Sequence, residues 1–597
     1  MYGRLIYQIM QILRGALDLE ELLHFALQLI AWVRLSRLGV LSGELAFDEH
    51  NLPRGVSQIT DVFEQLSDVS QTDIFKHDLL GKNSMAFGYV NPAVQHLSVG
   101  QLLQALEVLA AANLTDTWQF DDLMAFSNDK ASRGFIGLPI EVAELMIALA
   151  QISSGDKVYL PFEHGFQLTA CAQKKTKQTF SETQVATSFP WLINLLCDLE
   201  ANIAISDSLE KPAFLDQGRL TQFPVSVSCP PFNARYSQNL ADSDRFARFP
   251  EATSSGGVLA VRHLLARTKG RIVVAVPNGL LFTPGAERYL RDDVLAKKQV
   301  EAVVALPPAL LSGSAIQFSL LILRTDITCN DILFVDGSNE TLYVKDSRNK
   351  ATLTGWQSIV EAVVKRETGA FSNLITTEEV VANNSQLQVA RYCKTPDDDV
   401  VEQILRKYQI KALGELVSII RPIPLSQADG VVTVSEVAPA DFPVYGYVTK
   451  SGREIKLTER YINSERSYLR PFDIILTIKG SVGKVAILPE NTPENLWVMG
   501  QSCIVLRTNE KASSIDPRVI FSFLKSEVGQ LQFRSLTTGS AVPHIQVREL
   551  EKIRIPIPTA EEGQNIIEKF EKLAVIENAI VQYREEQEQL SKSIWTA

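Results

Sequence analysis

The sequence has few cysteines, no long uninterrupted apolar run and no excess of positive charge. Its six cysteines lack the CxxC spacing of zinc sites, and they are Cys171, Cys197, Cys229, Cys329, Cys393 and Cys503. We therefore expect a reducing cytoplasm and no metal site. The apolar stretch 5–38 is broken by six charged residues. We expect neither a membrane span nor a cleavable signal there.

The net charge of −11 excludes a generally basic nucleic-acid-binding surface. Residues 441–560 differ from the rest, because they hold 16 Lys and Arg against 12 Asp and Glu, a local charge of +4. Any contact with nucleic acid is expected from a patch in this part of the chain.

The pattern of apolar residues predicts a multidomain α/β protein. Leu and Ala at helical spacing indicate a helical N-terminal domain over 1–130. Apolar strands then alternate with helices, which is typical of a doubly wound, mostly parallel, Rossmann-like sheet over 131–345. Its expected strands are 157–160, 203–205, 225–228, 271–276, 300–306 and 320–323. The expected parts after it are a mixed connector over 346–409, a β-rich domain over 410–560 and a long helix over 561–597.

The final helix carries apolar residues at alternating three- and four-residue steps, which predicts a coiled-coil seam. A helix packed on its own domain is the alternative. The seam positions are Ile566, Phe570, Leu573, Ile576, Ile580, Tyr583, Gln587, Leu590 and Ile594.

Residues 225–232 read VSVSCPPF, an apolar strand followed by Pro-Pro-Phe. This segment resembles the catalytic loop of amino-group DNA methyltransferases, except that Cys229 stands where those enzymes have Asn, Asp or Ser. The resemblance implies that residue 229 and the Pro230–Pro231 carbonyl accept hydrogen bonds from the adenine amine while Phe232 stacks on the flipped base. A thiol is a weak acceptor. A strand simply ended by two prolines is the alternative.

Residues 130–325 together resemble the M subunit of type I restriction-modification systems, an adenine-N6 methyltransferase that uses S-adenosylmethionine. The matching segments include RGFIGLPIEVAELM at 133–146, GRIVVAVPNGLLF at 270–282 and VEAVVALP at 300–307. By this resemblance, the cofactor-binding positions are Leu160, Gly165, Glu182 and Asp207. For Glu182 a solvated helix glutamate is the alternative, and for His164 a loop histidine outweighs a catalytic base.

The cofactor loop departs from the family pattern. Only Gly165 remains of its glycines, Leu160 replaces an aspartate, and Phe162 and Phe166 add bulk where the amino-acid end of the cofactor needs space. Because the catalytic acceptor is altered as well, we predict an inactive methyltransferase-like domain that does not bind S-adenosylmethionine. A live methyltransferase with a divergent loop is the competing reading.

Residues 410–597 resemble a half S (specificity) subunit of the same systems, with one target-recognition domain and a spacer helix. The matching segments include LRPFDIILTIKGSVGKVAI at 469–487 and IRIPIPTAEEGQNII at 553–567. The resemblance implies contact with double-stranded DNA in the major groove. The candidate contact residues, grouped around residues 537–540, are Lys479, Lys484, Arg534, His544, Gln546 and Arg548.

The sequence thus predicts a DNA-recognition subunit of a restriction or anti-phage defence complex. Its expected partners are separate subunits, namely a nuclease, a translocase or an active methyltransferase, and a second copy pairing through 561–597. A scaffold that binds only proteins is a further alternative.

Overall fold

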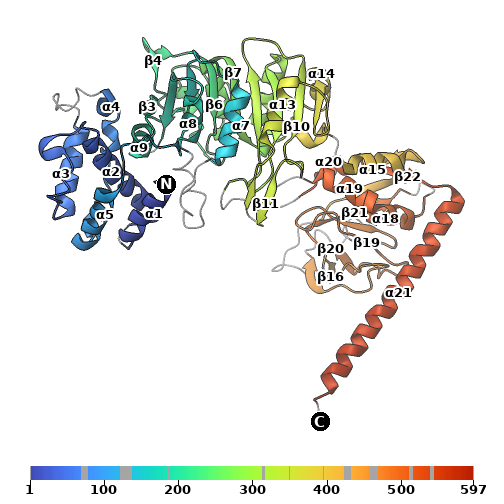
Figure 1. Ribbon diagram of the computed structural model, residues 1–597. Helices are drawn as coiled ribbons and strands as arrows, with labels where there is room; N and C mark the ends of the chain where they lie inside the picture. The colour runs from blue at the N-terminus through green and yellow to red at the C-terminus, as the bar shows by residue number, and fades with distance from the viewer. Residues whose placement is uncertain are drawn as a thin grey trace. The chain divides into compact units, whose positions relative to one another are not determined.

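The computed structural model divides the chain into two compact units, Met1–Cys393 and Lys394–Ala597, shown in Figure 1. Each unit has hydrophobic clusters of its own. The residues described are 2–15, 17–68, 78–120, 138–184, 187–311, 316–347, 350–393, 396–422, 432–457, 468–509, 515–537 and 544–595.

The first unit begins with a helical layer, as predicted. Its helices are α1 (Tyr2–Ile12), α2 (Leu19–Arg37), α3 (Val56–Ser67), α4 (Asp78–Gly81) and α5 (Val99–Ala111). The central helix is α2, which starts at a capping box between Asp18 and Glu21 and buries thirteen of its residues.

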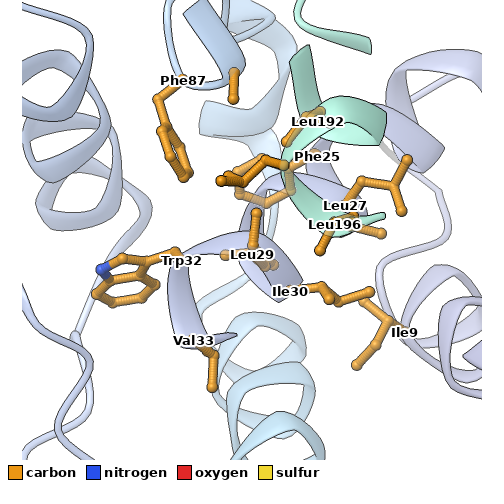
Figure 2. Packing of buried hydrophobic residues seen from close by; sticks show 14 of the residues in the cluster. Ile9, Phe25, Leu27, Leu29, Ile30, Trp32, Val33, Phe87, Leu192 and Leu196 are labelled. Atoms are coloured by element: carbon orange, nitrogen blue, oxygen red, sulfur yellow. The ribbon is translucent and has the colours of Figure 1, made fainter. Parts of the chain in front are cut away.

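The helical core continues into the following domain. It includes Phe166 and the helix α9 (Phe189–Leu196), and Figure 2 shows Leu192 and Leu196 of α9 beside Phe25 and Leu27 of α2. The buried Arg34 of α2 also forms a bidentate ion pair with Asp198, at 3.1 Å. The N-terminal helices and the start of the sheet domain therefore fold as one packed body.

A nine-stranded mixed sheet forms the centre of the first unit, in the order β13-β10-β8-β9-β7-β6-β1-β2-β3. Five of its pairings are parallel, and the antiparallel ones involve β9 or β13. Its strands are β1 (Val158–Leu160), β2 (Thr179–Thr183), β3 (Asn202–Ile205), β6 (Phe223–Ser228), β7 (Thr268–Pro277), β8 (Val300–Ala305), β9 (Phe318–Arg324), β10 (Asp331–Asp336) and β13 (Ser372–Thr376).

Apolar clusters cover both faces of this sheet, which confirms the doubly wound arrangement. Helices α7 (Ile140–Ala150), α8 (Gln167–Gln173) and α13 (Trp356–Lys365) supply one cluster. Helices α11 (Gly256–Arg267), α12 (Ala286–Ala296) and α14 (Thr377–Ala382) supply the other. Because β1 and β6 are parallel neighbours, the loops that follow them leave the same edge of the sheet.

All six strands expected in this region are present, as β1, β3, β6, β7, β8 and β9. The expected connector over 346–409 is divided between the units. Its first part supplies α13 and the edge strand β13 to the first unit, and its last part forms the helix α15 (Pro396–Leu405) of the second unit.

The second unit is rich in β structure, as predicted. It has a four-stranded antiparallel sheet of β15 (Val417–Ile420), β21 (Cys503–Thr508), β18 (Ile474–Thr477) and β19 (Val485–Ile487). A second sheet holds β17 (Arg453–Leu457), β16 (Val432–Val437) and β20 (Trp497–Met499), and β14 (Gln409–Ala412) pairs with β22 (Arg554–Ile557). Helices α16 (Leu413–Leu416), α18 (Pro517–Lys525), α19 (Glu527–Leu536) and α20 (Val547–Leu550) complete it.

The chain ends in the helix α21 (Ala560–Ser593), seen as the long red helix of Figure 1. Only Phe570 and Ala574 are buried along it. Phe570 packs edge-on against Tyr447 and Phe521, and Glu571 accepts hydrogen bonds from Tyr447 and Arg518. The first part of α21 is thus anchored on its own unit, and the seam beyond residue 574 lies exposed. Among the described helices, none has the length and apolar character needed to cross a membrane.

Candidate cavity and nucleic-acid interface

A cavity of about 340 Å³ lies where the loops after β1 and β6 meet. A hydrogen bond from the Ser228 hydroxyl to the Pro161 carbonyl, 3.1 Å long, holds the two loops together. The residues that line the cavity are Leu138, Phe162, Glu163, His164, Gly165, Gln167, Leu168, Gln184, Cys229, Pro230, Pro231, Phe232, Asn233, Leu311 and Ile316. The predicted catalytic loop and the predicted cofactor loop are therefore brought to one place.

All four residues of the predicted catalytic loop, Cys229 to Phe232, line the cavity. The Phe232 ring lies 5.2 Å from the ring of Phe318 on β9, which fixes its place in the wall. Burial, with a smaller effect from the Glu163 carboxyl, raises the pKa of the Cys229 thiol to about 12. The thiol is therefore neutral at physiological pH, and it is neither a nucleophile nor a strong hydrogen-bond acceptor.

Glu163 is the charged group that the sequence did not single out. Its side chain is 5% exposed, and burial raises its pKa to about 8. Backbone N–H groups of Phe166, Leu168 and Thr169 at the start of α8 act against this shift, which places them around the carboxyl group. Its Oε2 atom has no hydrogen-bond partner within the described residues. The signal in the sequence was an acid just before an apolar helix.

The predicted cofactor loop has two phenylalanines in a backbone conformation that usually favours glycine. Phe162 and Phe166 adopt left-handed conformations, with φ of 59° and 64°. Phe162 lines the cavity, but Phe166 is fully buried in the helical core and takes no space from the cavity. A Cβ at Gly165 would lie 2.2 Å from the Gln167 side-chain oxygen, so a larger residue there would displace the Gln167 side chain. Leu160 is buried in the sheet core.

Asp207 and Glu182 do not line the cavity. Asp207 accepts hydrogen bonds from the Gln184 amide at 2.9 Å and from the Leu209 and Glu210 N–H groups of its own turn. Glu182 is fully buried, so it is not the solvated helix glutamate that was the alternative. The structure therefore brings together Gly165 and the catalytic loop, but not these two acids.

Glu182 belongs to a buried polar network within the sheet domain. Arg267 lies 3.9 Å from it and stacks on the Tyr159 ring. The Tyr159 hydroxyl bonds to His263 Nε2 at 2.8 Å, and Arg248 donates to His263 Nδ1 at 2.7 Å. Burial and the two arginines lower the pKa of His263 well below its usual value. Since Arg248 can only donate, His263 is neutral with its proton on Nε2, and the network has a structural role.

The described residues contain no group of three or more His, Cys, Asp or Glu side chains placed to hold a metal ion.

The candidate DNA-contacting residues of the second unit gather around the turn between β18 and β19. Lys479 and His544 face each other in an isolated antiparallel bridge, and the Ile545 N–H donates to the Ile478 carbonyl at 3.0 Å. Gln546 and Arg548 follow this bridge at the start of α20. The predicted loop 537–540 lies largely outside the described residues.

Lys484 and Arg534 lie near the same turn between β18 and β19, because the helix α19 contacts this turn. The Gln530 amide of α19 donates to the Gly483 carbonyl at 3.0 Å, beside Lys484, and Arg534 is in the last turn of that helix. The side chains of Lys479, Lys484, Arg534 and Arg548 are exposed. None of the four forms an ion pair with a carboxylate of the described residues, so the cluster is a positive patch on an acidic protein. We call these four and His544 and Gln546 the basic patch.

Two families match consecutive parts of the chain. Residues 122–400 match the N-6 DNA methylase family, and residues 407–589 match the type I restriction modification DNA specificity domain.

Two curated relatives match the two parts separately. The type I restriction enzyme MpnII methylase subunit of Mycoplasma pneumoniae is 28% identical over 181 residues, 28% of this chain and 33% of that protein. The type I restriction enzyme EcoBI specificity subunit of Escherichia coli is 25% identical over 134 residues, 22% of this chain and 26% of that protein. The chain thus spans a third or less of the length of either relative.

The fold has a solved counterpart. The methyltransferase subunit of a type I restriction-modification system from Streptococcus thermophilus is similar with a TM-score of 0.52 and 18% identity, over 66% of this chain and 99% of that one. The two family matches follow each other along one chain. The polypeptide therefore joins a region that matches the N-6 DNA methylase family to a region that matches the type I restriction modification DNA specificity domain.

Proposed function

We propose that this protein recognises double-stranded DNA for a restriction or anti-phage defence complex, and that its methylase domain has no catalytic activity. The observation that carries the first half is the basic patch. Six candidates separated by up to 69 positions in sequence lie around one turn, one bridge and two helix ends. Unpaired cations at a rigid surface are what phosphate contact requires. The similarity to a specificity subunit of Escherichia coli supports the same role.

The test is DNA binding by the full chain as a function of salt. Changing Lys479 and Lys484 together to Ala should weaken binding to every sequence and reduce the salt slope by about 2, because each phosphate contact contributes about 0.9. Lys450 and Lys552 are exposed lysines of the same unit that form ion pairs, and the same change there is the matched control. Equal effects of the two double variants would contradict the proposal.

The pattern of sequence preference tests base reading. His544 and Gln546 are the members of the basic patch best suited to contact base edges rather than phosphates alone. Changing Gln546 to Ala should alter the ranking of DNA sequences by about 1–3 kcal/mol at one position. Selection of preferred sites from a random DNA pool, with the unmodified and changed chains, measures this ranking.

The absence of activity is supported by the chemistry of the cavity. Cys229 supplies a neutral thiol where an acceptor of the adenine amine is needed. The Glu163 carboxyl already faces the N–H groups at the start of α8, and Leu160 is a core residue. These described residues do not fit S-adenosylmethionine, because its carboxylate would meet the Glu163 carboxyl group and no Lys or Arg among the lining residues that the structure describes. Detectable N6-methyladenine in DNA incubated with the protein and the cofactor would refute this half.

A live adenine-N6 methyltransferase is the second candidate, favoured by one observation. The cavity beside Cys229 is open, because Phe166 points into the helical core rather than into it. Calorimetry with S-adenosylmethionine separates the two candidates. Micromolar binding would favour the live enzyme, and no binding supports the DNA-recognition role alone.

The expected partners are a second copy of this chain, paired through α21, and separate restriction subunits such as a nuclease, a translocase or an active methyltransferase. The exposed seam of α21 supports pairing, because large apolar side chains beyond residue 574 are left in water. We place the protein in the cytoplasm, in keeping with its six free cysteines.

A further inference from the structure

The cavity has an unusual balance of charge. Among the described residues that line it, none is Lys or Arg, and Glu163 is the carboxyl group. The other polar side chains are His164, Gln167, Gln184, Cys229 and Asn233, and the remaining wall is apolar or aromatic. A phosphate or carboxylate ligand would find no compensating cation here, so the lining is unsuited to anions.

Glu163 has one oxygen left without a partner. The carboxyl group is buried between the loop and the first N–H groups of α8, yet its Oε2 atom accepts no hydrogen bond from the described residues. Burying an unpaired polar oxygen costs free energy, and such atoms in folded proteins usually have a function. Because Glu163 lines the cavity, its carboxyl group borders the space that a ligand would occupy.

We propose that the cavity binds a small organic cation, a protonated or quaternary amine, with Glu163 as its counter-ion. Phe162 and Phe232 provide aromatic rings in the same wall, and aromatic rings attract ammonium groups. A volume of about 340 Å³ suits a molecule of a few to about twenty heavy atoms. This ligand differs from the cofactor of the family in carrying no carboxylate.

The state of Glu163 sets the strength of binding at each pH. In the empty cavity its pKa is about 8, so most of it is protonated at pH 7. A quaternary cation binds the ionised form of Glu163. At pH 7 the carboxyl group must first lose its proton, and the free energy needed for this makes binding about tenfold weaker than to the ionised form. Affinity should therefore rise about tenfold per pH unit up to pH 8 and then level off. Cys229 stays neutral over this range, because its pKa is about 12.

The experiment measures binding of choline and of its uncharged isostere 3,3-dimethylbutanol to the full chain, by saturation-transfer NMR at concentrations up to about 10 mM. We expect choline to bind at least tenfold more tightly than the isostere, and acetate not to bind. Glu163→Gln, which keeps the size but not the charge, should abolish the difference. Glu210→Gln, at an exposed acid outside the cavity, is the matched control and should bind as the unmodified chain does.

His164 is a second ionisable side chain that lines the cavity, so the pH series is repeated with His164→Gln. The rise up to pH 8 should persist in that variant. Should Glu163→Gln fail to fold, as judged by its melting temperature, the pH series in the His164→Gln chain decides the question.

Three results would overturn the proposal. They are equal binding of choline and its isostere, choline binding that Glu163→Gln leaves unchanged, and no binding of choline at any pH. Binding of S-adenosylmethionine is measured as well. Tight binding of this carboxylate-bearing molecule would also refute the claim that the site disfavours anions. None of these results bears on DNA recognition, because the basic patch lies in the other unit and its salt dependence is measured separately.

Discussion

The seam of α21 gives the prediction with the largest expected effect. Six large side chains along it, Leu573, Ile576, Ile580, Tyr583, Leu590 and Ile594, are between 39% and 72% exposed. Full burial of such a side chain is worth about 1.5–3 kcal/mol, so covering these half-exposed ones gains about 1–2 kcal/mol each. We expect the chain to self-associate through this surface.

Changing Ile580 and Leu590 together to Asp tests the seam. In a pair of helices this change removes four apolar contacts, which weakens association by about 4–8 kcal/mol, or roughly a thousandfold or more in Kd. The melting temperature of the second unit should not fall, because both side chains are exposed in the single chain. Gln582→Asp with Gln589→Asp, seven residues apart off the seam, adds the same charge and should leave association intact.

The assay is sedimentation equilibrium over a range of protein concentrations. A further variant, Phe570→Ala, should do the opposite of the seam variant, lowering the stability of the second unit by about 3–5 kcal/mol, because Phe570 packs against its own domain. A chain that is monomeric at all concentrations, or that associates equally after the seam change, would refute the reasoning.

Three further predictions concern the first unit. Cys229→Asn should not produce methyl transfer in a tritiated-cofactor assay, because the Glu163 carboxyl still faces the start of α8. Glu163 has a folded-state pKa of about 8 against an ordinary 4.5, so its contribution to stability is full below about pH 4.5 and is lost as the pH rises through 8. Glu163→Gln should therefore match the unmodified chain at pH 5 and be more stable at pH 9, by up to about 4–5 kcal/mol in urea unfolding. Phe166→Gly should destabilise this unit by about 2–4 kcal/mol in the same assay. Removing the ring leaves a void in the core, and this loss of stability exceeds the gain from relieving the backbone strain of a phenylalanine in the left-handed region.

Much of the sheet could be predicted because its central strands are runs of Val, Ile, Leu and Ala buried on both faces. β2 was not predicted, since its sequence TFSET is largely polar although the strand is mostly buried. Two of its polar side chains are hydrogen-bonded within the fold, Ser181 to Thr169 and Thr179 to Gln173. Hydrophobic periodicity cannot reveal a strand of this kind.

The candidate site was predictable only where a motif is contiguous. The segment Cys229 to Phe232 was found as a string of residues, and it lines the cavity. Glu163 was missed because its importance comes from burial and from the N–H groups of α8, which depend on the folded loop. The orientation of Phe166 was equally hidden, because a residue's position in a loop does not say which core its side chain joins.

Phe166 has a consequence beyond this loop. A glycine at that place would restore a flexible backbone at a left-handed position, but the phenylalanine now fills part of the core that holds the N-terminal helices to the sheet. Changing it to glycine alone would therefore lower the stability of this unit. A protein that is stable by only about 5–15 kcal/mol tolerates few such steps. The packing of Phe166 thus couples the conformation of the loop to the stability of the whole unit.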